Sequence, residues 1–65
     1  MNPEIAKLIM YKTEAEAKEI LKGYRAIYRV THRDGSALEY VVDDRNDKRY
    51  SLMVANGVVA RVYAG

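Results

Sequence analysis

Residues 13–30, TEAEAKEILKGYRAIYRV, contain the point at which the hydrophobic pattern of the chain changes its period. Thr13 and Glu16 stand in the Thr-x-x-Glu order of a capping box, which marks the start of a helix. Apolar residues then recur at helical spacing, so we predict a helix over residues 14–22 with Gly23 as the first residue past its end. After Gly23, apolar and polar residues alternate, as they do in a half-buried strand. A helix followed directly by a strand therefore determines the fold class.

A second helix signal lies upstream of this stretch. Asn2-Pro3-Glu4 offers a capping side chain, a proline at the first helical position and an acid in the first turn. A short apolar stripe follows at Ile5, Leu8 and Ile9. In one continuous helix this stripe would lie about a third of a turn away from the stripe of the later helix. We therefore predict a break near Lys12 and a separate, short helical turn before it.

Three further segments downstream alternate with a period of two, at residues 38–42, 50–54 and 58–63. Asp34-Gly35 and Asn56-Gly57 are turn sequences. The pattern predicts one α+β domain over residues 1–65: a short N-terminal helical turn plus one helix, packed on a small, mostly antiparallel sheet of three to four strands. Within it, we expect Tyr24, Tyr28 and Tyr50 to pack at the rim of the core with their hydroxyls reaching solvent.

The composition excludes several classes of function. The 65 residues include no cysteine and a single histidine, His32. The chain therefore has no disulfide framework, no thiolate metal site and no cysteine nucleophile, and His32 alone cannot build a zinc site or a Ser-His-Asp array. Its glycines are scattered and form no phosphate-binding loop. We expect neither enzymatic activity nor a bound cofactor or metal ion.

The remaining polar and apolar patterns point to an ordinary globular protein. Asp43, Asp44 and Asp47 lack the spacing of a calcium-binding loop, so we interpret them as solvated. No apolar run approaches the roughly 20 residues of a membrane span. The first residues lack the basic and apolar regions of a secretory signal, which favours the cytoplasm as the compartment.

The distribution of positive charge suggests a binding role. The net charge is only +2, but every arginine lies after residue 24. We expect Arg25, Arg29, Arg49 and Arg61 to share the outer face of the sheet with interleaved tyrosine, which is an arrangement suited to single-stranded nucleic acid. Glu39 falls on the same face, however, and the usual RNA-binding sheet motif is missing. A nucleic acid is therefore the least favoured partner, and a protein is the most favoured.

Short pieces of the sequence stand in a familiar order. Lys12-Thr13-Glu14-Ala15-Glu16-Ala17 starts the helix, Gly35-Ser36 follows the first strand, and Gly57-Val58-Val59-Ala60-Arg61-Val62 ends the chain together with Gly65. Over residues 10–65 this order resembles the potato inhibitor I family and its bacterial relatives. The resemblance implies a disulfide-free inhibitor of serine proteases of the subtilisin and chymotrypsin kinds, which offers an extended loop in the form of a substrate.

The resemblance also implies roles for particular residues. The protease-binding loop would consist of Leu38, Glu39, Tyr40 and Val41, and Arg45 and Arg49 would brace it from the body of the protein. Two alignments remain open. Matching the apolar–acid–aromatic order places Leu38 in the specificity pocket of the protease, whereas matching the loop length places the scissile bond between Tyr40 and Val41.

An alternative interpretation has no inhibitory loop. Residues 37–42 also have the pattern of an ordinary strand that pairs with residues 24–31 through the Asp-Gly turn. The sheet would then be a four-stranded antiparallel meander, as in small PepSY-type domains and in phage or bacterial modulators of other protein machines. In either case the last strand, residues 58–63, presents an edge that would pair with a second copy unless residues 5–11 fold back over it.

Overall fold

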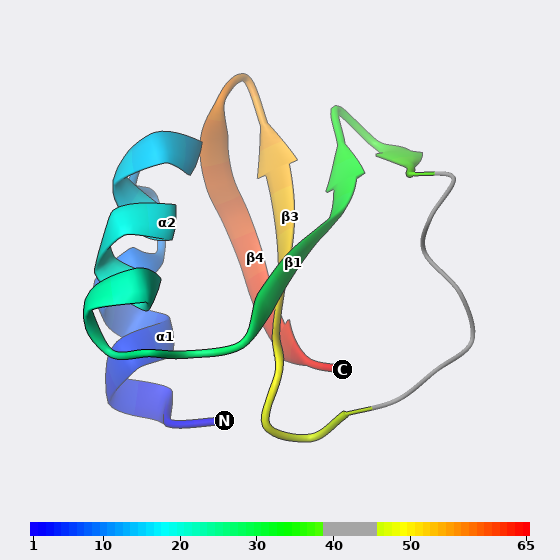
Figure 1. The fold of residues 1–65 in the computed structure, drawn as a ribbon. Coiled ribbons are helices and arrows are strands. Elements are labelled where there is room, and N and C mark those ends of the chain that lie inside the picture. The colour runs from blue at the N-terminus through cyan, green and yellow to red at the C-terminus, as the bar shows by residue number, and fades with distance from the viewer. Residues whose placement is uncertain (39–45) are drawn as a thin grey trace.

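Two helices and a four-stranded sheet form the protein in a computed structural model that describes residues 1–38 and 46–65 (Figure 1). In chain order the elements are α1 (Pro3–Ile9), α2 (Glu14–Gly23), β1 (Tyr28–Arg33), β2 (Ser36–Ala37), β3 (Tyr50–Ala55) and β4 (Val58–Ala64). The strands are arranged in the order β2-β1-β3-β4. The predicted α+β class, with helices before a mostly antiparallel sheet, is confirmed.

One pair of strands departs from the antiparallel pattern. β1 pairs with β2 and β3 pairs with β4 in the antiparallel sense, but β1 and β3 are parallel, with Tyr28 opposite Tyr50. The meander considered from the sequence is therefore not the topology of this sheet. Two parallel neighbours cannot be joined by a tight turn, because the chain must return along the whole strand before it enters the second one. Residues 34–49 make this return, and we call them the crossover connection.

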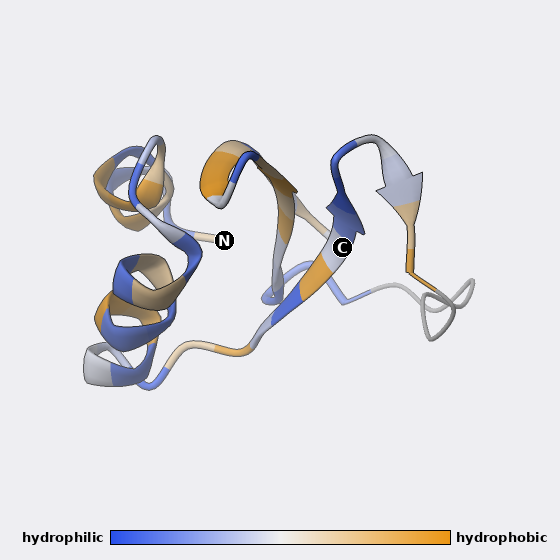
Figure 2. Ribbon diagram, turned by 90° about the horizontal axis from the view of Figure 1, so that it is seen from above, coloured by the Kyte–Doolittle hydropathy of each residue, from blue (hydrophilic) through white to orange (hydrophobic). Residues whose placement is uncertain are grey.

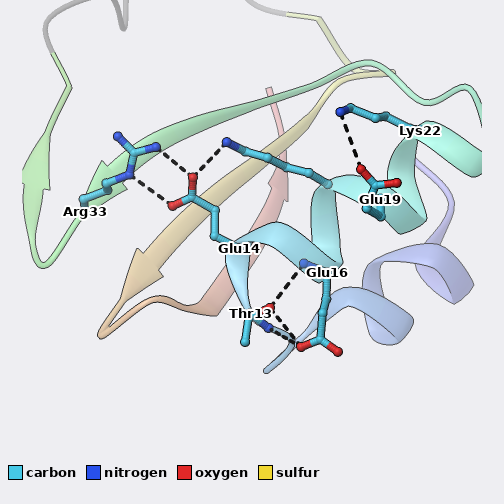
Figure 3. Close-up of polar contacts among 7 residues, drawn as sticks. Thr13, Glu14, Glu16, Glu19, Lys22 and Arg33 are labelled. Atoms are coloured by element: carbon cyan, nitrogen blue, oxygen red, sulfur yellow. Dashed lines mark hydrogen bonds and ion pairs between the residues drawn. The ribbon is translucent and has the colours of Figure 1, made fainter.

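The helix α2 begins where the sequence predicted. The Thr13 hydroxyl accepts a hydrogen bond from the Glu16 N–H at 3.2 Å, and the Glu16 carboxylate accepts one from the Thr13 N–H at 3.2 Å (Figure 3). This is the predicted capping box. The upstream helix is also capped as expected, since the Asn2 side chain accepts from the Glu4 N–H at 2.9 Å.

The end of α2 differs from the prediction. Gly23 is still helical, and the residue in the left-handed region is Arg25, with φ of 56°. The N–H of Arg25 donates to Lys22 and the N–H of Ala26 donates to Leu21, both at 2.9 Å, which is the hydrogen-bond pattern of a Schellman motif. The helix therefore ends later than the glycine suggests, and the first strand begins at Tyr28 and not directly after Gly23.

The core lies between the helices and the sheet. Both helices lie together on the same side of the sheet (Figures 1 and 2). The edge strand β2, at the opposite end of the strand order from β4, lies away from them. The buried apolar side chains come from both helices and from three strands: Ile9, Ala17, Leu21, Val30, Tyr50, Leu52, Val54 and Val59. Of the three tyrosines predicted at the rim, Tyr50 is fully inside, Tyr28 is half-buried and Tyr24 is 57% exposed. Tyr24 was wrongly placed because it caps the helix and does not belong to the strand.

Residues that join the two helices cover part of the outer edge of β4. The N–H of Tyr11 donates to the Val59 carbonyl, and the Val59 N–H donates to the Lys12 carbonyl, each at 2.9 Å. The N–H of Glu14 donates to Gly57 at 2.9 Å. The first residues of this edge are thus covered by Tyr11, the last residue of the segment expected from the sequence, and by Lys12 and Glu14, which follow it.

Candidate functional site

The crossover connection leaves β1 through a tight turn. Asp34 and Gly35 both have positive φ, 52° and 83°, which is the backbone form that Asp-Gly favours in two-residue turns. The turn brings Ser36 and Ala37 back beside β1 as the short strand β2. Leu38 continues this pairing, since its N–H donates to the Thr31 carbonyl at 3.0 Å, and its half-buried side chain packs against the core. We call residues 34–38 the upstream stem.

The upstream stem is fastened to two other parts of the fold. The Asp34 carboxylate accepts from the N–H of Asn56 at 2.8 Å, and the Asp34 N–H donates to the Val54 carbonyl at 2.8 Å. One residue earlier, the Arg33 guanidinium donates two parallel hydrogen bonds to the Glu14 carboxylate, at 3.1 and 2.8 Å (Figure 3). These contacts fix the start of the crossover connection to the β3–β4 hairpin and to the first turn of α2.

The Glu14 carboxylate has a strongly cationic environment. It accepts both Arg33 bonds and also pairs with Lys18 at 2.8 Å. The hydrogen bonds from Arg33, and after them the one from Lys18, lower the pKa of the Glu14 carboxyl from its ordinary 4.5 to about 2. The carboxylate is therefore charged at all but strongly acidic pH.

The crossover connection enters β3 through a second fixed segment, residues 46–50, which we call the downstream stem. Asn46 organises a turn: its side chain accepts from the Lys48 N–H and its carbonyl from the Arg49 N–H, both at 3.0 Å. The Arg49 carbonyl accepts from the Gly65 N–H at 3.2 Å. The Tyr50 N–H then donates to Ile27 at 2.8 Å and starts the parallel ladder.

Two arginines converge on one backbone oxygen beside this stem. Arg49 donates to the Gly65 oxygen through Nε at 3.0 Å and through Nη2 at 2.6 Å, and Arg29 donates to the same oxygen through Nη2 at 3.0 Å. Arg29 lies in β1 opposite Ser51, and Arg49 lies two residues before Ser51, so the parallel pairing brings both side chains within reach of Gly65. The Gly65 oxygen, directly after the end of β4, is thereby held by side chains from β1 and from the residue before β3.

The face of the sheet beside this cluster is polar but tightly packed. The Tyr63 hydroxyl donates to the buried Thr31 hydroxyl at 3.0 Å, and Thr31 donates to the Leu52 carbonyl at 3.3 Å. Gly65 lies against the Tyr63 ring, since a Cβ added to Gly65 would be 3.4 Å from the ring. The Ser51 hydroxyl is buried on this face without a hydrogen-bond partner in the described part of the chain.

The structure describes only some of the residues predicted for the site. Leu38 belongs to the upstream stem and Arg49 to the downstream stem, whereas Glu39, Tyr40, Val41 and Arg45 lie outside the described residues. Among the four arginines predicted to share a face, Arg29 and Arg49 meet at Gly65, while Arg25 ends α2 and Arg61 lies over the Tyr63 ring at 6.0 Å.

Sequence reasoning did not assign Arg29 a bracing role. Its position on the strand was treated only as part of a charged face, because its partner Gly65 is remote in sequence. The available signal was the alternation of side chains along the strand. Because Arg29 precedes the inward-facing Val30, its side chain had to lie on the opposite face of the sheet, on which Ser51 also lies.

Within residues 1–38 and 46–65, no three side chains of His, Asp or Glu gather in a group that would hold a metal ion. Neither described helix has the length and apolar character required to cross a membrane. No protein family, no curated protein and no solved structure matches this chain.

Proposed function

We propose that the protein inhibits a serine protease by presenting part of its crossover connection as a substrate-like segment. The observation that carries the proposal is the parallel pairing of β1 and β3, which are joined by a connection whose two stems are each fixed by several hydrogen bonds. A segment held at both ends loses little freedom when it binds, so the ordering cost of binding is reduced in advance. The sequence resemblance to potato inhibitor I supports the same function.

The upstream stem favours one of the two alignments of the loop. A residue that enters a specificity pocket must have a free side chain and a backbone free to pair with the protease. Leu38 has neither, because its N–H is bonded to Thr31 and its side chain packs on the core. We therefore place the scissile bond between Tyr40 and Val41, with Tyr40 in the specificity pocket. A tyrosine at this position suits proteases of the chymotrypsin kind.

The arginine cluster supports the bracing role. Arg49 was predicted as a brace together with Arg45, and Arg29 on the neighbouring strand donates to the same Gly65 oxygen as Arg49. In the proposal, Arg29 acts as a further brace. The shared contact of Arg29 and Arg49 with Gly65 ties the C-terminal end to the downstream stem. In the proposal, this contact keeps the stem in place when the connection is attacked.

The test is a titration of chymotrypsin and of subtilisin with the intact chain. We expect inhibition of chymotrypsin at a one-to-one ratio, retained by Tyr40→Phe and lost in Tyr40→Asp. The matched control is Tyr24→Asp, which changes an exposed tyrosine at the end of α2 and is expected to leave inhibition unchanged. Rapid and complete digestion of the parent chain between residues 37 and 45 would contradict the proposal.

A second candidate function is assembly through the edge strand β4. The predicted dimer through residues 58–63 is restricted by Tyr11 and Lys12, which occupy both backbone groups of Val59. A partner strand would therefore pair with residues 60–64. Sedimentation of the parent chain and of Ala60→Pro tests this: a dimer that disappears in the variant supports edge pairing, and a monomer at high micromolar concentration contradicts it.

A further inference from the structure

The first residues of the chain contact the downstream stem. The backbone N–H of Asn2 donates to the hydroxyl oxygen of Tyr50 at 3.0 Å, and the Met1 nitrogen donates to the Asp47 carbonyl at 2.9 Å. Figure 1 shows the start of α1 and the start of β3 at the same end of the molecule. Residues 1 and 2, which are remote in sequence, thus contact the residues on either side of Arg49 in the downstream stem.

Tyr50 is the residue through which this contact is made. Its side chain is only 4% exposed, and its backbone N–H is committed to the parallel ladder with Ile27. A buried tyrosine hydroxyl generally needs a hydrogen-bond partner. Here the partner is the N–H of Asn2, the residue that caps α1 and is itself held by the Glu4 N–H. Tyr50 therefore joins the fixed start of a helix to the residue directly after Arg49.

We infer that Tyr50 is a positioning residue of the inhibitor, whose hydroxyl holds the downstream stem in place through Asn2 while a protease is bound. This inference rests on the proposed function. Attack of the protease serine oxygen on the Tyr40 carbonyl breaks the Tyr40–Val41 amide, and the Val41 nitrogen takes a proton and leaves as an amine. The Tyr40 carbonyl carbon is then joined to the serine oxygen as an ester. The Val41 amine re-forms the amide and releases the serine hydroxyl only while the downstream stem keeps this amine beside the ester.

The variant Tyr50→Phe removes the hydroxyl and keeps the buried ring. We expect chymotrypsin to cleave the Tyr40–Val41 bond of this variant about tenfold faster than that of the parent chain, which is the scale of one lost hydrogen bond. We also expect faster amide hydrogen exchange at Arg49, because the stem opens more often. Both measurements are made well below the unfolding temperature and are compared with a variant of lowered stability, because exchange and cleavage also respond to global opening.

Two matched controls separate positioning from stability. Tyr28→Phe removes a tyrosine hydroxyl at the register position beside Tyr50 and is expected to leave cleavage unchanged. Thr13→Ala removes the hydroxyl that caps α2 at Glu16, a contact separate from the Asn2–Tyr50 hydrogen bond. It is expected to lower the thermal stability while leaving cleavage and the Arg49 exchange rate unchanged.

The outcomes distinguish this inference from the proposed function. Unchanged cleavage and unchanged exchange in Tyr50→Phe overturn the inference, while inhibition by the parent chain leaves the proposed function standing. If the parent chain does not inhibit chymotrypsin, the proposed function fails. Faster exchange in Tyr50→Phe then still supports the stem-holding role of Tyr50, and unchanged exchange overturns it. An equal acceleration of cleavage by Thr13→Ala would assign the effect to a general loss of stability and also overturn the inference.

Discussion

Arg33 at the end of β1 and Glu14 at the first turn of α2 are joined by two parallel hydrogen bonds of 3.1 and 2.8 Å. A bidentate pair of this kind fixes both the separation and the relative orientation of the two groups. Because Asp34 follows Arg33 directly, the pair also sets the position at which the crossover connection begins. The first turn of the helix thus contributes to the geometry of a segment that lies far from it in sequence.

The Arg33–Glu14 pair predicts that the free energy of unfolding depends on pH in the acid range. The folded-state pKa of Glu14 is depressed to about 2, so its contribution is complete above pH 4.5 and is lost as the pH falls from 4.5 towards 2. Glu14→Gln should lower the free energy of unfolding by about 1 kcal/mol near neutral pH, a modest value because Arg33 and Lys18 are partly exposed. The difference in the free energy of unfolding between the variant and the parent chain should vanish as the pH falls to about 2. Denaturant unfolding at several pH values measures this difference.

The control for this prediction is Glu19→Gln. Glu19 faces Lys22 at 3.7 Å, and both side chains are largely exposed (Figure 3). This variant should change stability little at any pH. An equal loss in both variants would contradict a specific role of the Glu14 pair.

The left-handed residue at the end of α2 predicts a stabilising substitution. Arg25 has φ of 56°, a conformation that disfavours side chains with a Cβ and that glycine adopts freely. Arg25→Gly should raise the free energy of unfolding by about 1 kcal/mol. Asn56→Gly is the matched control: Asn56 has φ of 53°, but asparagine tolerates this region, so the gain should be smaller. Thermal unfolding checks both, and a loss of stability in Arg25→Gly would contradict the argument.

Two buried hydroxyls on the outer face predict opposite responses to removal. The Thr31 hydroxyl is bonded to Tyr63 and Leu52, so Thr31→Val should cost about 1–3 kcal/mol by leaving those groups without their partner. The Ser51 hydroxyl is buried and has no hydrogen-bond partner among residues 1–38 and 46–65, so Ser51→Ala should be neutral or slightly stabilising. Denaturant midpoints measured side by side test the contrast. Equal losses in the two variants would show that Ser51 has a partner in solution.

The arginine cluster predicts that Arg29 and Arg49 act together. In the proposed inhibitor, Arg49→Ala should speed cleavage of the connection while the chain stays folded, because a hydrogen bond of a charged group contributes only about 1.5–3 kcal/mol. Arg29→Ala should have a similar effect, since both donate to the Gly65 oxygen. Arg61→Ala, which changes an exposed arginine over Tyr63, should leave cleavage unchanged. Equal cleavage rates in the parent chain and in the Arg45→Ala, Arg49→Ala double variant would refute the bracing role.

Local chemistry made much of the fold predictable. The capping box at Thr13, the Asn-Pro start of α1 and the Asp-Gly and Asn-Gly turns depend on neighbouring residues alone, and the structure has all of them. The break between the helices also followed from the sequence, because two stripes out of phase cannot face one core. The class of the fold was correct for this reason.

The rest of the fold depends on contacts between remote residues. A period of two is the same in parallel and antiparallel strands, so the parallel pairing of β1 and β3 was not determined by the pattern. Gly23 looked like the first residue past α2, but Gly23 is the last helical residue and Tyr24 is the cap, so the left-handed position falls on Arg25. The role of Arg29 depends on Gly65, which no local signal connects to it. Of the candidate site, only Leu38 and Arg49 lie in the part that the structure describes.

The parallel pair also has a kinetic consequence for folding. The β3–β4 hairpin closes through the adjacent residues Asn56 and Gly57 and is able to form early, whereas β1 docks on β3 only after the chain has closed residues 34–49 into a ring. The entropy of that closure grows slowly with length, by about 0.6 kcal/mol for each doubling. Lengthening the connection should therefore slow folding several-fold at most and leave the unfolding rate nearly unchanged, so this segment is able to vary in length at little cost to the rest of the fold.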